Sequence, residues 1–244
     1  MQVAMVGGGM SGDAIVRAVE ERGHTVTRLS RSTGFGVLRD DALAALEGAD
    51  VIIEATGQFP TNRKKATAFF TGSTSALSAA ATTLGARHVL LSIVNCTLPE
   101  VQGYGYFAGK TAQEQTALAA SSRLTIVRST QWHEFVQQNL ARMKVGPFAL
   151  VPGMTIAPVA LDTVASVIGD VAGGGRTEPI IEITGPETTT LWEMTKAAPH
   201  TGITPVPLPI PGSMGRAFRG GALVPGAGAE VMGPRFEEWL ATQR

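Results

Sequence analysis

Disulfides, net charge and long apolar runs are all missing from this chain of 244 residues. Cys96 is the single cysteine, which excludes an internal disulfide and favours a reducing compartment, the cytoplasm. Twenty basic residues balance twenty acidic ones, so neither a nucleic-acid partner nor an anionic membrane surface is expected. We expect no membrane-spanning helix, because no run of about 18 apolar residues occurs. The four histidines are scattered without acidic or cysteine partners, so we expect no metal site.

What the chain does contain is a large apolar fraction, 44%, and 29 glycines, with few aromatic residues (6%). These numbers predict a sizeable core and tight strand–loop–helix turns more than a β-sandwich. The length suits one doubly wound domain with a modest appendage. The first six residues lack a basic leader and lead directly into glycines, so we expect a strand there and no signal peptide.

The first half of the chain alternates short apolar runs with helical stretches, which is typical of βαβ units. We therefore predict an α/β fold with a Rossmann-type, doubly wound parallel sheet. The expected strands are Val3–Val6, Thr25–Leu29, Asp50–Glu54, His88–Val94 and Leu124–Arg128. The expected helices are Gly12–Arg22, Asp41–Leu46, Ala66–Leu84 and Tyr106–Ser121.

A glycine loop follows the first strand, where residues 7–12 read Gly-Gly-Gly-Met-Ser-Gly and contain G-x-G-x-x-G. Chance alone gives about 0.4 such matches in so glycine-rich a chain, so the position between a strand and a helix carries the inference. Gly7 would permit the turn, Gly9 a close approach to a pyrophosphate, and Gly12 tight helix–strand packing. Backbone N–H groups of the first turn, at Met10 and Ser11, would then face the phosphates. A glycine-rich turn without a ligand is the alternative.

The end of the second strand bears on the choice of dinucleotide. No acid that would bind the ribose hydroxyls of NAD occurs before Asp40. Arg31, with Ser30 and Ser32 beside it, can instead hold a 2′-phosphate through charge-assisted hydrogen bonds. We therefore expect NADP, with NADPH preferred, whereas a solvated basic turn is the alternative.

A tyrosine and a lysine are spaced for proton transfer. Tyr106 and Lys110 stand four residues apart in a predicted helix and so share one face. The ammonium would favour the phenolate and bring the phenol into range for acid–base chemistry. Ser92, near the end of its strand, would polarise a carbonyl oxygen. The alternative is an aromatic residue packed beside an unrelated lysine.

Beyond residue 130 the pattern loosens. We divide the chain into a nucleotide-binding core, 1–130, and a smaller, loop-rich, substrate-binding portion, 131–244, packed on it as a single structural unit. Pro199–Gly233 is rich in proline and glycine and predicts an extended surface segment, or a flap over a pocket, more than a helix. The other elements expected here are strand and loop at Pro147–Ala160, helices at Asp162–Ala172 and Thr189–Ala198, and a strand at Ile180–Thr184.

Some residues near the predicted site support two interpretations. Trp132 and His133 follow the fifth strand and would line a substrate pocket, or serve as a packed aromatic residue and a helix cap. Asn95 lies close by and is also counted with the pocket. Cys96 has no visible neighbour that would stabilise a thiolate, so a small buried residue is expected.

These motifs together resemble atypical short-chain dehydrogenases/reductases, and most nearly the NmrA-like NAD(P)-binding proteins. The resemblance rests on the glycine loop, the strand ending at Arg31, residues 88–94, the Tyr106–Lys110 pair and residues 127–135. It implies that Ser92, Tyr106 and Lys110 are catalytic and that Lys110 also contacts the cofactor. It also implies that Thr56 and Gly57 approach the adenosine half of the cofactor.

Two features depart from the family pattern. The glycine loop is spaced G-x-G-x-x-G, whereas many members have G-x-x-G-x-x-G with glycine where Val6 stands. The asparagine of full catalytic tetrads has no clear counterpart, although Asn95 is nearby. The resemblance therefore supports cofactor binding more strongly than turnover.

The leading functional hypothesis is an NADPH-dependent oxidoreductase that reduces a small, rather apolar carbonyl or quinone-like compound, with Tyr106 as general acid. One alternative is a non-catalytic regulator that binds NADP(H) and senses redox state. Another is a nonredox lyase, cyclase or isomerase on the same scaffold. The expected partner is a small-molecule substrate, and the oligomeric state stays open, with a homodimer as one expectation.

Overall fold

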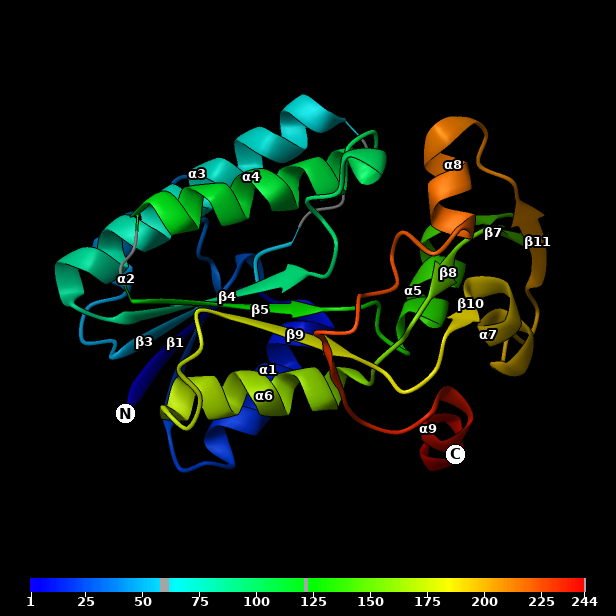
Figure 1. The fold of residues 1–244 in the computed structure, drawn as a ribbon. Helices are drawn as coiled ribbons and strands as arrows, with labels where there is room; N and C mark the ends of the chain where they lie inside the picture. The colour runs from blue at the N-terminus through cyan, green and yellow to red at the C-terminus, as the bar shows by residue number, and fades with distance from the viewer. Residues whose placement is uncertain (58–61, 121–122, 244) are drawn as a thin grey trace.

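A computed structural model describes residues 1–57, 62–120 and 123–243 and contains a central parallel sheet of seven strands (Figure 1). The spatial order is β12-β9-β5-β4-β3-β1-β2, and every neighbouring pair is parallel. The strands are β1 (Gln2–Val6), β2 (Thr25–Leu29), β3 (Val51–Glu54), β4 (Arg87–Ile93), β5 (Leu124–Ser129), β9 (Ile180–Thr184) and β12 (Glu230–Val231). The predicted Rossmann-type α/β class is confirmed.

The strand order places a topological switch point between β1 and β3. From β1 the chain moves outward to β2 at one edge, and then returns to β3 on the other side of β1. This 2-1-3-4-5 sequence is one of the two common doubly wound orders, in which ligands bind outside the carboxyl ends of the strands flanking the switch point. The glycine loop and the segment after Glu54 meet at that position.

Two pairs of helices cover the sheet. α1 (Gly9–Glu20) and α6 (Leu161–Gly173) pack on one face, and α3 (Arg63–Leu84) and α4 (Gly105–Ala120) lie side by side on the other (Figure 1). The helix predicted from Gly12 therefore begins earlier, at Gly9. Ser121, the predicted last residue of the fourth helix, lies outside the described residues. A short helix, α2 (Ala42–Ala45), begins after Asp41, whose carboxylate accepts from two of its amides.

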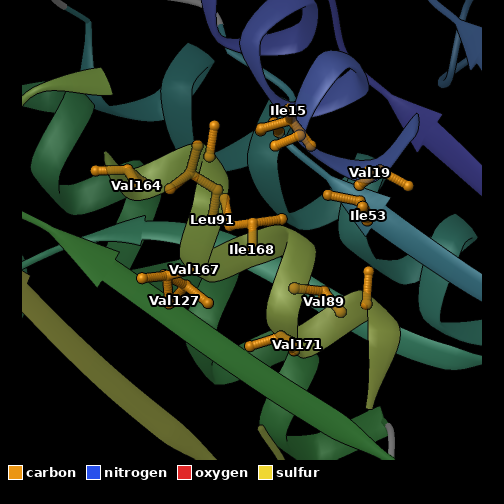
Figure 2. Close-up of a cluster of buried hydrophobic side chains, with 14 of the residues drawn as sticks. Ile15, Val19, Ile53, Val89, Leu91, Val127, Val164, Val167, Ile168 and Val171 are labelled. Atoms are coloured by element: carbon orange, nitrogen blue, oxygen red, sulfur yellow. The ribbon is translucent and has the colours of Figure 1, made fainter. Parts of the chain in front are cut away.

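The two faces of the sheet carry different side chains, because alternate residues of a strand point to opposite sides. The face under α1 and α6 carries a large apolar cluster, part of which Figure 2 shows. The face under α3 and α4 carries apolar residues and also polar ones, among them Glu54, His88, Ser92 and Arg128.

The chain after β5, apart from α6, β9 and β12, builds a smaller portion beside the carboxyl end of the sheet. Its apolar cluster joins Phe107 of α4 to residues such as Leu140, Val151 and Phe218. Its helices are α5 (Phe135–Arg142), α7 (Leu191–Ala197), α8 (Gly212–Arg219) and α9 (Phe236–Thr242). Its strands are β6 (Lys144–Val145), β7 (Phe148–Pro152), β8 (Thr155–Ile156), β10 (Thr189–Thr190) and β11 (Thr204–Leu208), in the small sheets β11-β7-β6 and β10-β8.

The expectation that Pro199–Gly233 avoids helix is wrong, because α8 forms within it. Pro211 occupies the residue before this helix, where its missing N–H costs nothing. The extended part is correct in kind: β11 is an edge strand, and Pro205 and Pro207 alternate along it. Alternate prolines leave the amides of Thr204, Val206 and Leu208 to face β7, and the Thr204 amide donates to Pro147 O.

Candidate functional site

The glycine loop forms a cradle that only glycine fits. Gly7 has φ +138°, and a Cβ there would lie 2.5 Å from the carbonyl oxygen of Ala55, at the end of β3. Gly9 has φ +69°, which is the left-handed region, and a Cβ on Gly12 would lie 3.2 Å from Gly7 O. The three glycines, spaced as the sequence predicts, thus place backbone without side chains at the switch point.

The N-terminus of α1 opens into this cradle. Gly8 precedes the helix, and no side chain caps the first turn. The first-turn amides and the positive end of the helix dipole therefore suit an anion. Met10 is exposed and Ser11 half-buried in that turn. Asp13, the one awkward charge nearby, is held by Arg28 at 2.9 Å.

The turn after β2 lies beside the cradle, since a Cβ on Gly8 would stand 3.2 Å from Cβ of Ser30. Ser30 and Ser32 share a hydrogen bond of 2.8 Å between their hydroxyl oxygens. Arg31 begins a 3₁₀ turn, Arg31–Thr33, and is exposed to solvent. Arg28 differs from Arg31, because its guanidinium forms an ion pair with Asp13 at 2.9 Å.

Tyr106 and Lys110 lie on α4 as the sequence predicts, but in different surroundings. Tyr106 is half-buried, with its ring centroid 5.8 Å from that of Phe70 on α3. Burial raises the pKa of Tyr106, and the charge of Arg142 opposes the rise. The expected lowering of this pKa by Lys110 is therefore wrong.

The reason is the location of the lysine ammonium. Lys110 is 3% exposed, and its Nζ donates to Leu91 O at 2.7 Å and to Oε1 of Gln113. It also lies 5.2 Å from the centroid of the Phe70 ring. These contacts direct the ammonium into the protein instead of toward the phenol.

Ser92 and its neighbours occupy the end of β4. Ser92 is buried, and its Oγ lies 3.9 Å from Sγ of Cys96, a weak contact. Burial, with the charge of Glu114, raises the pKa of Cys96 to about 12, which keeps it a thiol. The amide nitrogen of Asn95 donates to the carbonyl oxygens of Ala222 and Val224, at 3.0 and 2.8 Å, so this residue anchors the C-terminal segment.

Three buried polar atoms just past β5 have no hydrogen-bond partner among the described residues: Thr130 Oγ1, Gln131 Oε1 and His133 Nδ1. Buried polar atoms are normally paired, so a cluster without partners at a strand's carboxyl end indicates a ligand position. Sequence reasoning missed Thr130; its only signal was the place directly after a parallel strand. Trp132 is less available, because its Nε1 donates to Ser129 Oγ at 3.0 Å.

An apolar groove of about 400 Å³ extends from the glycine loop to α9. Met10, His133, Phe236 and Trp239 are among its walls. His133 packs against both aromatic rings, with centroids 5.4 and 5.3 Å away. Its Nε2 lies 3.1 Å from Pro234 O, and since a carbonyl only accepts, this nitrogen carries the proton.

Sequence reasoning also missed Glu54, the last residue of β3, which is fully buried. Burial pushes the pKa of Glu54 upward, but hydrogen bonds from His88 and Thr74, with the charges of His88 and Lys110, bring it below its ordinary value. The burial of Glu54 could not be predicted from the sequence, because an acidic residue at the end of a strand is usually exposed.

Among the described residues, no helix is long and apolar enough to cross a membrane. Within the same parts of the chain, no cluster of three or more histidine, cysteine, aspartate and glutamate side chains is arranged to hold a metal ion.

No protein-family model matches the chain, and no curated protein matches it. Solved structures do share its fold. The NADP complex of dTDP-4-dehydrorhamnose reductase from Bacillus anthracis is 12% identical, with a TM-score of 0.70 over 99% of this chain and 97% of that one. The NADPH complex of an NADPH-dependent quinone oxidoreductase from Escherichia coli is 12% identical, with 0.68 over 99% of both chains. UDP-N-acetylglucosamine 4-epimerase from Bacillus cereus is 13% identical, with 0.69 over 99% and 94%.

Proposed function

We propose that the protein is an NADPH-dependent oxidoreductase that reduces a small, rather apolar carbonyl or quinone-like compound. The observation that carries the proposal is the bare-backbone cradle at the switch point, where a Cβ on Gly7 would strike Ala55 O at 2.5 Å. The atoms nearest that position are backbone atoms of Ala55 and Thr56, so the loop packs closely on the end of β3, as the tight turn of a dinucleotide-binding loop requires. The similar fold of reductases solved with NADP and with NADPH adds support.

Different residues of the chain would contact different parts of the cofactor. The first-turn amides of α1 bind the pyrophosphate, and Arg31 with its serine neighbours binds the 2′-phosphate. Residues after β3 contact the adenosine half, and Lys110 contacts the nicotinamide ribose. The proposed set is Gly7, Gly9, Met10, Ser11, Gly12, Ser30, Arg31, Ser32, Thr56, Gly57 and Lys110.

NADPH, when bound, supplies a hydride to the carbonyl carbon. Tyr106 then donates its phenolic proton to the oxygen, and Ser92 orients that oxygen by a hydrogen bond. The raised pKa of Tyr106 keeps the phenol protonated at neutral pH, which is the form that a general acid needs. The weak contact of Ser92 with Cys96 leaves its hydroxyl able to serve a substrate.

The apolar groove beside Met10 would hold only the outer part of the substrate, because neither Tyr106 nor Ser92 is among its lining residues. Its walls are mostly apolar and aromatic, and its volume of about 400 Å³ suits a small organic molecule. Nδ1 of His133 is a bare acceptor, because the proton resides on Nε2. His133 is 0% exposed, so any donor that pairs with this nitrogen would have to reach a buried atom.

The test is a titration of NADPH against the wild-type protein and Gly7→Ala, followed by a panel of quinones, ketones and aldehydes with NADPH oxidation as readout. We expect wild type to bind and Gly7→Ala to lose binding, since its Cβ has no space. Gly48→Ala is the control, because Gly48 also has positive φ, +78°, but open space around it. Equal binding by wild type and Gly7→Ala, or none by wild type, would reject the proposal.

A second candidate is a regulator that binds NADP(H) and reports its redox state. The specific observation in its favour is that Lys110 is already engaged by Leu91 O and Gln113 instead of by the phenol. A regulator needs no acid–base pair. Different affinities for NADPH and NADP⁺, with no turnover over the whole carbonyl panel, would favour this function over the first.

A further inference from the structure

A buried carboxylate at the end of β3 collects hydrogen-bond donors from four parts of the fold. Glu54 is 0% exposed, so its charge is removed from water and must be compensated inside the protein. Its donors are Thr56 Oγ1 at 3.1 Å, Ser73 Oγ at 3.3 Å, Thr74 Oγ1 at 2.8 Å, Gln113 Nε2 at 2.7 Å and, on the other oxygen, His88 Nε2 at 3.1 Å.

Gln113 links this carboxylate to Lys110. A carboxylate only accepts, so Gln113 must turn its amide nitrogen toward Glu54. Its carbonyl oxygen then faces Nζ of Lys110 and accepts from it. The orientation of the amide, and with it the acceptor offered to the lysine, is therefore fixed by Glu54.

Lys110 depends on nearby negative charge. Burial lowers the pKa of Lys110, and Glu54 is the first of the groups that counter this, before Cys96 and Glu114. Glu114 is shared, because Arg128 forms an ion pair with it at 2.6 Å. His88 faces the same carboxylate from β4. Without Glu54, the Lys110 ammonium would be left with Cys96, whose effect on its pKa is smaller, and with Glu114, which is already paired with Arg128.

The geometry points to Glu54 as a positioning residue of the nucleotide site: it holds the Lys110 ammonium through Gln113 and joins it to Thr56, so that two residues proposed to contact the cofactor are fixed by one carboxylate. The inference rests on the proposed function for the contacts of Lys110 and Thr56 with the nucleotide. The hydrogen-bond chain itself does not depend on any ligand.

The experiment has two readouts, one of which needs no nucleotide. The chain has only five lysines, so labelling them with ¹³C at Cε gives few NMR signals, and the spectrum of Lys110→Arg assigns one. The titration of Lys110 is followed in wild type, Glu54→Gln and Glu182→Gln. The dissociation constant of NADPH is measured for the same proteins at several pH values. Glu182 is the control, because it pairs with Arg128 at 2.8 Å and, within the described parts of the chain, forms no hydrogen bond with Gln113 or Lys110.

We expect Glu54→Gln to move the Lys110 titration to lower pH by about one unit or more. NADPH binding should weaken about tenfold and weaken further as pH rises, because the lysine loses its proton. Glu182→Gln should change neither. Should Glu54→Gln fail to fold, Gln113→Met cuts the same link while keeping the carboxylate, and it should weaken NADPH binding to a similar extent.

Each remaining outcome is decisive. An unchanged Lys110 titration in Glu54→Gln overturns the inference while NADPH binding by wild type keeps the proposed function. A lower unfolding midpoint with unchanged NADPH affinity shows a structural role only and also overturns it. If wild type binds no NADPH, the proposed function fails, and the positioning role for a nucleotide is overturned even where the lysine titration shifts.

Discussion

At the scale of single residues, the proposed oxidoreductase activity depends on the hydroxyl group of Tyr106. Tyr106→Phe keeps the ring that packs against Phe70 and Phe107 and removes the proton donor. We expect turnover to fall by about 10²- to 10⁴-fold. NADPH affinity should stay the same. Steady-state kinetics with a nucleotide titration measure both, and a fully active variant would contradict the assignment.

Because the pKa of Tyr106 is raised, the reduction and the reverse oxidation should depend on pH in different ways. Reduction needs the phenol, which stays protonated well above neutrality, so its rate should be flat up to about pH 10, the ordinary value for tyrosine. Oxidation of the product alcohol needs the phenolate, so its rate should climb with pH without levelling below that value. Initial rates in both directions test this. A plateau of the oxidation rate near neutrality would show that the bound cofactor or Lys110 has lowered the pKa.

Arg31 and Arg28 form a matched pair for cofactor selectivity. Arg31→Ala should weaken NADPH binding about tenfold and leave NADH binding unchanged, because only NADPH has a 2′-phosphate for the guanidinium. Arg28→Ala removes a similar charge, but one already paired with Asp13 at 2.9 Å, so it should leave the NADPH to NADH ratio alone. Titrations with NADPH and NADH test this prediction. An equal effect of the two variants on the ratio of the two affinities would show that other residues set the selectivity.

At the scale of elements, the contact between α3 and α4 positions Tyr106. Gly109 lets the helices approach: a Cβ there would lie 2.6 Å from Cδ2 of Phe70 and 3.1 Å from Cβ of Ala66. Gly109→Ala should lower the free energy of unfolding by about 1–3 kcal/mol through overpacking, despite the better helix propensity of alanine. Gly103→Ala, whose Cβ would meet Met214 Sδ at an ordinary 3.6 Å, is the control for chemical denaturation. Equal stability of Gly109→Ala and wild type would show that the helices separate easily.

Elements with a strong periodic pattern were predictable from the sequence. Strands such as Ile180–Thr184 and helices such as 161–173 match their predicted bounds within a residue, because apolar spacing fixes which face is buried. The glycine cradle was also predictable, since glycine alone tolerates its backbone. Helix α8 was not, because its glycine and flanking prolines read as a loop while the apolar contact of Phe218 favours a helix.

The site itself was predictable only in part. Spacing placed Tyr106 and Lys110 on α4 but said nothing of the direction of the ammonium, which is set by Leu91 O and Gln113. Nothing in the sequence joins Glu54 to Gln113, because that pair is 59 residues apart and meets only when the sheet and α4 are assembled. Hydrogen-bond partners of this kind follow from the tertiary fold.

At the scale of the whole molecule, the C-terminal segment is held to the rest of the fold by polar contacts at separate positions. Asn95, with φ +60°, holds the backbone at Ala222 and Val224. Further on, the amide of Phe236 donates to Glu187 at 2.9 Å, and Pro234 O accepts from His133. Hydrogen bonds from both the core and the second portion therefore hold the end of the chain against the groove.

One of these ties makes stability depend on pH. Burial lowers the pKa of His133 from 6.5, although its bond to Pro234 O opposes the shift. The unfolded chain then binds the extra proton first, so this contribution is complete above pH 6.5 and is lost as pH falls toward the lower folded value. The pKa of Glu54 is lowered too, which adds a second loss below pH 4.5. Glu134 acts in the opposite sense, because burial raises its pKa.

We therefore expect urea unfolding midpoints to be level from pH 6.5 to about pH 8, before the thiol of Cys96 ionises in the unfolded chain, and to fall below pH 6.5. His133→Gln should flatten the first part of this fall and leave the steeper loss below pH 4.5, which belongs to the Glu54 network. Trp239 lies in α9 with its ring 5.3 Å from the imidazole of His133, so its fluorescence should report the first part of the fall in stability. The same slope in His133→Gln and wild type between those two pH values would show that the C-terminal tie does not respond to acid.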